Sequence, residues 1–120
     1  MTQKVVAGYL DGIPLVKVQG DLDRANGVQV IHWGEEASAG SSGALILDMS
    51  DCTYIDSGGL GSLFSLLQLL PPRSVVVLFG TNPDVERLLD MVGLLHTPYL
   101  RVFADEEDVR TAHFAGEFEV

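Results

Sequence analysis

Ser57 stands in the stretch of this sequence that most clearly indicates chemistry, Tyr54-Ile55-Asp56-Ser57-Gly58-Gly59-Leu60-Gly61. A carboxylate precedes the Ser57 hydroxyl, and three glycines follow it within four positions. Each glycine destabilises a helix by about 1 kcal/mol relative to alanine, so the stretch indicates a need for bare backbone beside the serine. Such a serine can cap a helix, attack a substrate as a nucleophile, or accept a phosphoryl group that changes the surface charge.

The sequence argues against catalysis by Ser57. A nucleophile elbow has the pattern Gly-x-Ser-x-Gly, and Ile55 occupies its first glycine position. No histidine stands at a recognisable spacing to act as the base, because the three histidines are scattered along the chain at His32, His96 and His113. Neither they nor the single cysteine form a metal-ligand pattern, and no Walker-type phosphate loop occurs. We therefore expect no enzyme activity, no metal and no cofactor.

The elements that position Ser57 follow from apolar runs and turn residues. Strands are predicted at residues 5–10, 15–18, 44–49, 74–79 and 100–103, and a loop at 40–43. Helices are predicted at residues 24–39, despite Gly27 and Gly34, and at 57–70, 83–92 and from 105 onward. The turn Asp11-Gly12 makes an opening hairpin, and helices and strands alternate after it.

This order of elements predicts one α/β domain over residues 1–120, with a mixed, mainly parallel sheet, an N-terminal hairpin and four helices. The tail, residues 114–120, is too short to assign and is expected to fray. Ser57 would then lie at the carboxyl edge of a central parallel strand, where α/β proteins place their binding sites.

The predicted helix over residues 57–70 has two distinct faces. One face carries large apolar residues that we assign to the core: Leu60, Leu63, Phe64, Leu67 and Leu70. The opposite face is small and uncharged, with Gly58, Gly61, Ser62, Ser65 and Leu69. Solvated helix faces usually carry Lys and Glu, whereas small residues let another surface approach closely. Two interpretations stay open: this face docks a partner, or the protein's own C-terminal helix covers it.

Charge narrows the choice of partners. Seven Lys and Arg against seventeen Asp and Glu give a net charge of −10. This balance argues against binding nucleic acid or an anionic membrane surface, because both depend on basic side chains. No apolar run is long enough to insert into a membrane, no signal peptide is recognisable, and the lone Cys52 is ordinary in a reducing cytosol. We expect a cytoplasmic protein.

Residues 45–61, from Leu45-Ile46-Leu47-Asp48-Met49-Ser50 to Gly61, resemble the signature of the STAS domain family, typified by bacterial anti-sigma factor antagonists. That signature is a hydrophobic strand with Asp-x-Ser, followed by Asp-Ser-Ser-Gly-Leu-Gly. Gly20-Asp21-Leu22-Asp23 is similar to the family's Gly-Glu-Leu-Asp, and residues 82–94 are similar to its Arg-Leu-Leu and Gly-Leu pattern. The likeness covers about residues 5–112, with Gly58 in place of a second serine and Asp21 in place of glutamate.

The resemblance implies that a partner serine kinase, which is itself the anti-sigma factor, phosphorylates Ser57. The unphosphorylated protein binds this kinase and frees a sigma factor, phosphorylation ends the binding, and a serine phosphatase restores it. Asp23 and Asp56 match acidic positions that flank the serine. The predicted partner-binding set comprises Asp21, Asp23, Asp56, Gly58, Gly59, Gly61, Ser62, Ser65 and Leu69.

Two other functions compete with this one. The domain could be a scaffold or ligand-binding subunit of a transporter or stress-sensing assembly, which Leu66 and Leu69 on the helix surface would favour. A small serine hydrolase would need a histidine close to Ser57. The sequence leaves the oligomeric state open.

Overall fold

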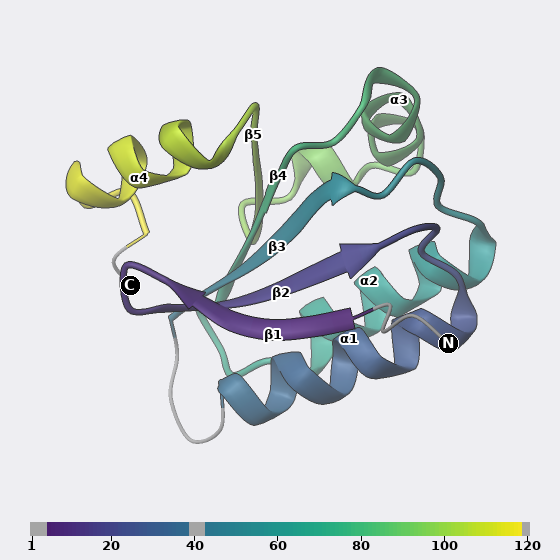
Figure 1. Ribbon diagram of the computed structural model, residues 1–120, viewed down its shortest axis with the longest axis horizontal. Helices are drawn as coiled ribbons and strands as arrows, with labels where there is room; N and C mark the ends of the chain where they lie inside the picture. The colour runs from purple at the N-terminus through teal and green to yellow at the C-terminus, as the bar shows by residue number, and fades with distance from the viewer. Residues whose placement is uncertain (1–4, 39–42, 119–120) are drawn as a thin grey trace.

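The computed structural model describes residues 5–38 and 43–118 and has an α/β architecture (Figure 1). Its elements follow in the order β1 (Val5–Leu10), β2 (Ile13–Gln19), α1 (Arg24–Ala37), β3 (Ala44–Asp51), α2 (Ser57–Leu69), β4 (Val75–Phe79), α3 (Pro83–Met91), the short 3-10 helix η1 (Leu94–His96), β5 (Leu100–Phe103) and α4 (Glu106–Phe114). The predicted hairpin, strands and four α-helices are confirmed, whereas η1 was not expected. Residue 39 of the first predicted helix and residues 40–42 of the predicted loop lie outside the described residues.

The described strands form one sheet in the order β1-β2-β3-β4-β5. β1 and β2 pair antiparallel, and every later pair is parallel, which confirms the mixed, mainly parallel sheet. Asp11 and Gly12 both have positive φ angles, 49° and 83°, as a two-residue hairpin turn of type I′ requires. Because β2 and β3 run parallel, the connections that leave their carboxyl ends emerge at the same edge of the sheet.

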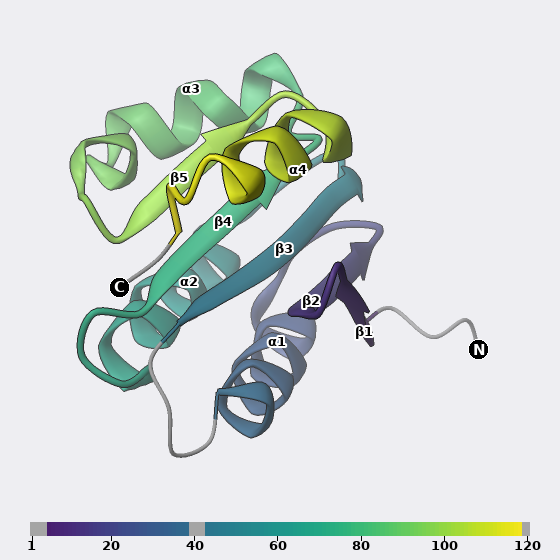
Figure 2. The same ribbon diagram turned by 90° about the vertical axis from the view of Figure 1, so that its left-hand side faces the viewer.

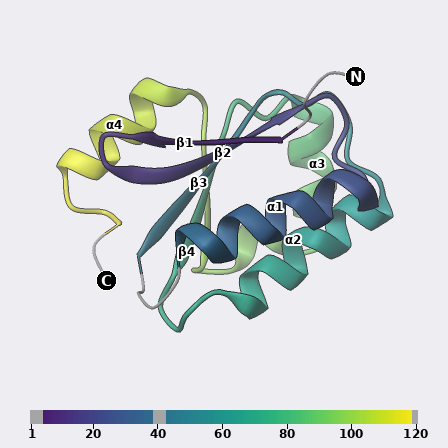
Figure 3. The same cartoon turned by 60° about the horizontal axis from the view of Figure 1, so that its bottom comes forward.

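Helices cover both faces of the sheet. Leu45, Leu47 and Met49 of β3 point to the face that carries α1, α2 and α3, while Ile46 points to the face that carries α4. This is why β3 reads as a nearly continuous apolar run. Figure 3 shows α1 and α2 side by side against the sheet, and Figure 2 shows α4 on its other face. Among the described residues, no helix combines the length and apolar character needed to cross a bilayer.

The C-terminal segment packs more closely than expected. Phe118 is 5% exposed and belongs to the core on the α4 side of the sheet. Its ring meets Phe103 edge-on at 5.7 Å and stacks against His113 at 6.3 Å. The prediction of a frayed tail is therefore wrong for Phe118, because its aromatic surface completes the cover of β5. Residues 119–120 lie outside the described part.

Close contact between α1 and α2 explains the two glycines inside α1. A Cβ at Gly27 would clash with the Ser62 side chain, 2.5 Å from its Cβ, and a Cβ at Gly34 would lie 2.7 Å from a methyl carbon of Leu66. Ser62 and Leu66 are accordingly buried, at 7% and 1% exposed. Glycine thus lowers intrinsic helix stability here but allows the two helices to approach each other.

Alanine at Gly27 should destabilise the protein, although alanine stabilises most helix interiors. We expect Gly27→Ala to lower the free energy of unfolding by about 1–3 kcal/mol, because α1 and α2 must separate. Gly61→Ala is the matched control: its Cβ meets nothing within 4 Å, so we expect up to about 1 kcal/mol of stabilisation. Urea denaturation measures both. Equal effects of the two substitutions would contradict the packing described here.

Candidate functional site

Two strand-to-helix connections lie against each other at the carboxyl edge of the sheet, one from β2 to α1 and one from β3 to α2. Leu22 and Ile55 form an isolated parallel bridge between them. The Leu22 N–H donates to the Tyr54 carbonyl at 2.9 Å, and the Asp56 N–H donates to the Leu22 carbonyl at 3.2 Å. These bonds hold the N-termini of α1 and α2 in a fixed relative position.

Equivalent aspartates cap the two helices. Asp23 Oδ1 accepts from the Asn26 N–H at 2.8 Å, and Asp56 Oδ1 accepts from the Gly59 N–H at 2.8 Å. Each carboxylate satisfies a helix N–H that has no partner within the helix and complements the positive end of the helix dipole. Asp56 is therefore a structural cap whose second oxygen still contributes negative charge beside Ser57.

Ser57 is the first residue of α2, and its side chain is exposed. The cap at Asp56 positions the serine, because it fixes where the helix begins. The structure thus places Ser57 at the lip of the sheet as an exposed residue, as the sequence analysis expected.

The glycines after Ser57 serve internal packing. A Cβ at Gly59 would overlap the Leu22 carbonyl oxygen and lie 2.8 Å from its carbon. A Cβ at Gly58 would lie 2.9 Å from the Cβ of Arg24 and 3.1 Å from its backbone nitrogen. The bare backbone that the sequence indicated is therefore required by the β2–α1 connection. Gly59 is buried, so its predicted contact with a partner is wrong.

A buried asparagine completes the site and was missed by the sequence analysis. Asn26, 7% exposed, donates from Nδ2 to the Asp21 carbonyl at 2.6 Å. The Asp21 carboxylate accepts from the Thr53 hydroxyl at 3.2 Å, and the Thr53 carbonyl accepts from Asn82 Nδ2 at 3.1 Å. The only signal in the sequence was a second polar residue three positions after the capping Asp23. Asp21 itself is exposed, as a partner-binding residue must be.

The exposed face of α2 differs from the predicted one. Ser62 is buried beneath α1, so its place on an open docking face is wrong, and the same is true of the surface position expected for Leu66. The helix that covers these residues is α1. The C-terminal helix α4 packs on the opposite face of the sheet. Phe64, assigned to the core, is instead 43% exposed.

The residues of α2 that remain open share one property, the absence of charge. Those classed as exposed are Ser57, Gly61, Phe64, Gln68 and Leu69, with Ser65 half-buried beside them. We call this set the open face of α2. Gly58 is half-buried at its margin. The face is apolar enough to dock against another surface, and Ser57 lies at one end of it.

The titratable groups of the described residues offer little chemistry at this site. Burial raises the pKa of the Cys52 thiol, whose sulfur donates to the Tyr54 carbonyl at 3.4 Å. Within residues 5–38 and 43–118, no group of three or more metal-ligating side chains comes together. The histidines contact Trp33, Asp90 and Phe118, respectively, and none of these contacts lies at Ser57. Among the described residues, Ser57 therefore has no hydrogen bond to a histidine that would mark a hydrolase site.

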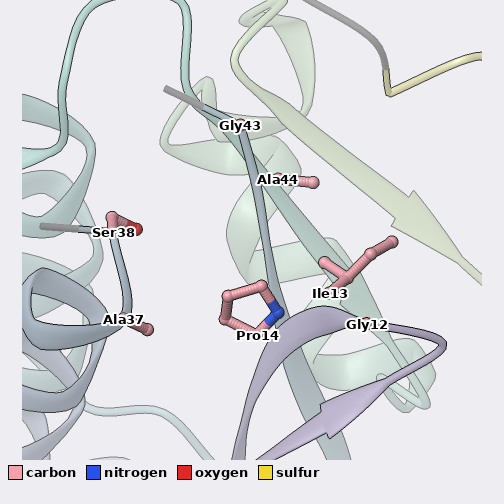
Figure 4. Close-up of a pocket in the computed structure, with 7 residues that line it drawn as sticks. All are labelled: Gly12, Ile13, Pro14, Ala37, Ser38, Gly43 and Ala44. Carbon is pink, nitrogen blue, oxygen red and sulfur yellow. The ribbon is translucent and has the colours of Figure 1, made fainter. Parts of the chain in front are cut away.

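A shallow pocket of about 210 Å³ lies at the end of the sheet away from Ser57, between the hairpin turn, the end of α1 and the start of β3. Figure 4 shows its lining residues, Gly12, Ile13, Pro14, Ala37, Ser38, Gly43 and Ala44. None of these seven has an ionisable side chain. This pocket offers no group for acid, base or metal chemistry.

Comparison with known proteins shows the family to which this chain belongs. The model of the STAS domain family matches residues 5–109. The chain belongs to the STAS domain family. The matched residues include α1, α2 and the two hydrogen-bonded strand-to-helix connections described above.

Individual relatives are similar to this chain in sequence and in fold. The domain is 28% identical over 85 residues to an anti-sigma F factor antagonist of Paenibacillus polymyxa, and the alignment covers 69% of this chain and 73% of that protein. The structure of an anti-sigma factor antagonist from Mycobacterium paratuberculosis matches with a TM-score of 0.75 and 23% identity, covering 90% of this chain and 91% of the other. The Bacillus cell fate determinant SpoIIAA in its phosphorylated form matches with a TM-score of 0.66 and 17% identity, covering 90% and 98%.

This STAS domain has Gly58 where the family signature has a second serine, and the structure predicts how a serine at this position would change stability. We expect Gly58→Ser to lower the free energy of unfolding by about 1–3 kcal/mol, because the first turn of α1 occupies the space of the new side chain. Gly61→Ser, in open space on the same helix, should change it by less than about 0.5 kcal/mol. Thermal or urea denaturation compares them. A Gly58→Ser variant as stable as the wild type would contradict this prediction, because α1 would then move aside without any loss of stability.

Proposed function

We propose that this STAS domain is an anti-sigma factor antagonist whose binding to an anti-sigma factor serine kinase is switched off by phosphorylation of Ser57. The unphosphorylated domain binds the kinase, and the sigma factor held by that kinase is released. A serine phosphatase removes the phosphate and restores binding. The domain itself performs no catalysis in this scheme. The observation that carries the proposal is the exposed Ser57 hydroxyl beside the uncharged open face of α2.

The relatives support this scheme. The Paenibacillus polymyxa protein is an anti-sigma F factor antagonist by name, and the SpoIIAA structure is that of a phosphorylated protein with the same fold. That likeness supports the idea that a phosphate can be added to this architecture without a change of fold.

Local electrostatics explain why the fold would tolerate the phosphate. Ser57 is the first residue of α2, where the helix dipole favours negative charge by about 0.3–1 kcal/mol. Because the side chain is exposed, the phosphate stays hydrated and is not transferred into the core. Phosphorylation would therefore leave the free energy of unfolding nearly unchanged.

The same charge would prevent docking. A phosphoserine adds about −1.5 to −2 charges next to the Asp56 carboxylate and within about one Debye length of it, roughly 8 Å. The open face of α2 carries no cation that could pair with the phosphate. Burying such a charge against a partner without a basic group costs several kcal/mol, and each ~1.4 kcal/mol weakens binding tenfold. The switch would change the surface without refolding the domain.

The roles of the predicted partner-binding residues follow from their exposure. Asp21 and the half-buried Asp23 and Asp56 would border the docked surface, while Gly61, Ser65 and Leu69 would contact it together with Phe64. Ser62, Gly58 and Gly59 would act from within, by holding α1 and α2 together. Of the two leucines that favoured the scaffold hypothesis, Leu66 is buried and Leu69 is exposed.

Ser57→Asp should remain folded and bind a serine kinase of the anti-sigma class from the same genome at least tenfold more weakly than the wild type. The reason is the added charge beside Asp56. Ser57→Ala should bind as the unmodified protein does and resist phosphorylation. Isothermal titration calorimetry measures the affinities, and phosphate incorporation identifies the modified residue.

The matched control is Ser38→Asp, which adds a charge at the far end of α1. It should leave kinase affinity within about twofold, a change well below 1 kcal/mol. If Ser57→Asp kept wild-type affinity, or if phosphate entered a residue other than Ser57, the proposed switch would be wrong.

Phe64→Ala should weaken kinase binding by at least tenfold, since a half-exposed aromatic ring at the centre of the open face is a typical interface anchor. Val28→Ala is the matched control: Val28 is 61% exposed, but on α1. Calorimetry with both variants tests whether the kinase docks on α2. Equal losses would place the docked surface elsewhere.

A further inference from the structure

A groove with aromatic walls lies between β1 and the end of α1, away from the site of Ser57. It has a volume of about 280 Å³, and its walls include Tyr9 from β1 and Trp33 and Glu36 from α1. Val5 belongs to the core on the α1 side of the sheet, so the alternation along β1 directs Tyr9 to that same side. Tyr9 is 75% exposed and Trp33 39% exposed. The groove thus offers two aromatic side chains to a ligand.

The electrostatics of this groove favour a cation. Among the described residues that line it, Glu36 alone is charged. Within residues 5–38 and 43–118, the Glu36 carboxylate forms no ion pair. α1 ends at Ala37 with no basic residue in its last turn, so no cation of the helix itself lies at the negative end of the helix dipole. The net charge of −10 adds a longer-range attraction for cationic partners.

Aromatic rings beside a carboxylate suit a guanidinium group better than other cations. The flat guanidinium of arginine stacks on tryptophan and tyrosine faces, and its N–H groups can form two parallel hydrogen bonds with one carboxylate. The ammonium group of lysine is a compact, strongly hydrated point charge and has no flat surface for stacking. Trp33 and Glu36 on one wall therefore indicate recognition of arginine.

The exposure of Tyr9 indicates that this arginine belongs to a polypeptide. A free guanidinium compound would leave much of the Tyr9 ring uncovered, whereas a segment that presents an arginine can cover the ring as well. The N-termini of α1 and α2 are held together, and Glu36 lies about three turns further along α1. A segment bound in this groove would therefore leave Ser57 accessible.

We propose that this groove is a docking site for an arginine in a basic segment of a protein partner. The guanidinium would stack on Trp33 and donate to the Glu36 carboxylate, and the aliphatic part of the arginine side chain would pack against Tyr9. This function goes beyond the proposed phosphorylation switch. The domain could hold a basic partner here in either phosphorylation state of Ser57.

The fluorescence of Trp33 tests the proposal on the full chain, because it is the single tryptophan of the sequence and lies in the groove. The probe is a capped hexapeptide of alternating glycine and arginine. It should change the emission in a saturable manner, and higher salt should weaken its binding. The same peptide with citrulline, an uncharged analogue of arginine, should bind at least about tenfold more weakly, and the lysine peptide at least about threefold more weakly.

Substitutions in the groove test the contacts. Glu36→Gln should weaken binding of the arginine peptide at least about fivefold, and Tyr9→Ser at least about threefold. Trp33→Leu, measured by the anisotropy of a labelled peptide, should weaken it at least about fivefold. The matched control is Glu35→Gln, which removes the same charge from an exposed residue that does not line the groove, and affinity should stay within about twofold. Circular dichroism verifies that the variants fold.

Four outcomes would overturn the proposal. The emission could show no saturable change, or the citrulline peptide could bind as tightly as the arginine peptide. Equal losses in Glu36→Gln and Glu35→Gln would mean that the peptide is attracted only by the overall acidity of the chain. If N-acetylarginine amide bound within about threefold of the peptide, the advantage that three arginines give by number alone, the groove would be a site for small molecules. Ser57 enters none of these measurements, so the groove and the phosphorylation switch can fail independently.

Discussion

The pairing of two strand-to-helix connections is the constraint on which the candidate site depends. Leu22 exchanges backbone hydrogen bonds with the segment that ends in Asp56, and the absence of a side chain at Gly59 lets the two backbones meet. Once they are joined, Asp23 and Asp56 cap adjacent helices, and the start of α2 is fixed. The position of the Ser57 hydroxyl is a consequence of backbone geometry.

The same constraint sorts the residues of α2 into inner and outer ones. Because the helix N-termini are held together, α1 and α2 run side by side, and glycines in α1 let Ser62 and Leu66 pack directly beneath it. What remains outside is a face without charge that has Ser57 at one end. In the proposed switch, this face would accept a partner while it is neutral and reject it after phosphorylation of Ser57. The proposed regulation would require no movement of the fold.

The sequence by itself determined the elements, the mixed sheet and the place of Ser57, since these depend on local signals: apolar runs, capping residues and turn residues. The family followed from the resemblance of residues 45–61 to the STAS signature. The tertiary structure alone decided which side of α2 is covered, because periodicity shows that a helix has two faces but not which neighbour approaches each. Gly27 and Gly34 read as weak points until α1 was seen against Ser62 and Leu66. Phe64 and Phe118 were misplaced for the same reason: burial depends on residues distant in the chain, and no local signal records them.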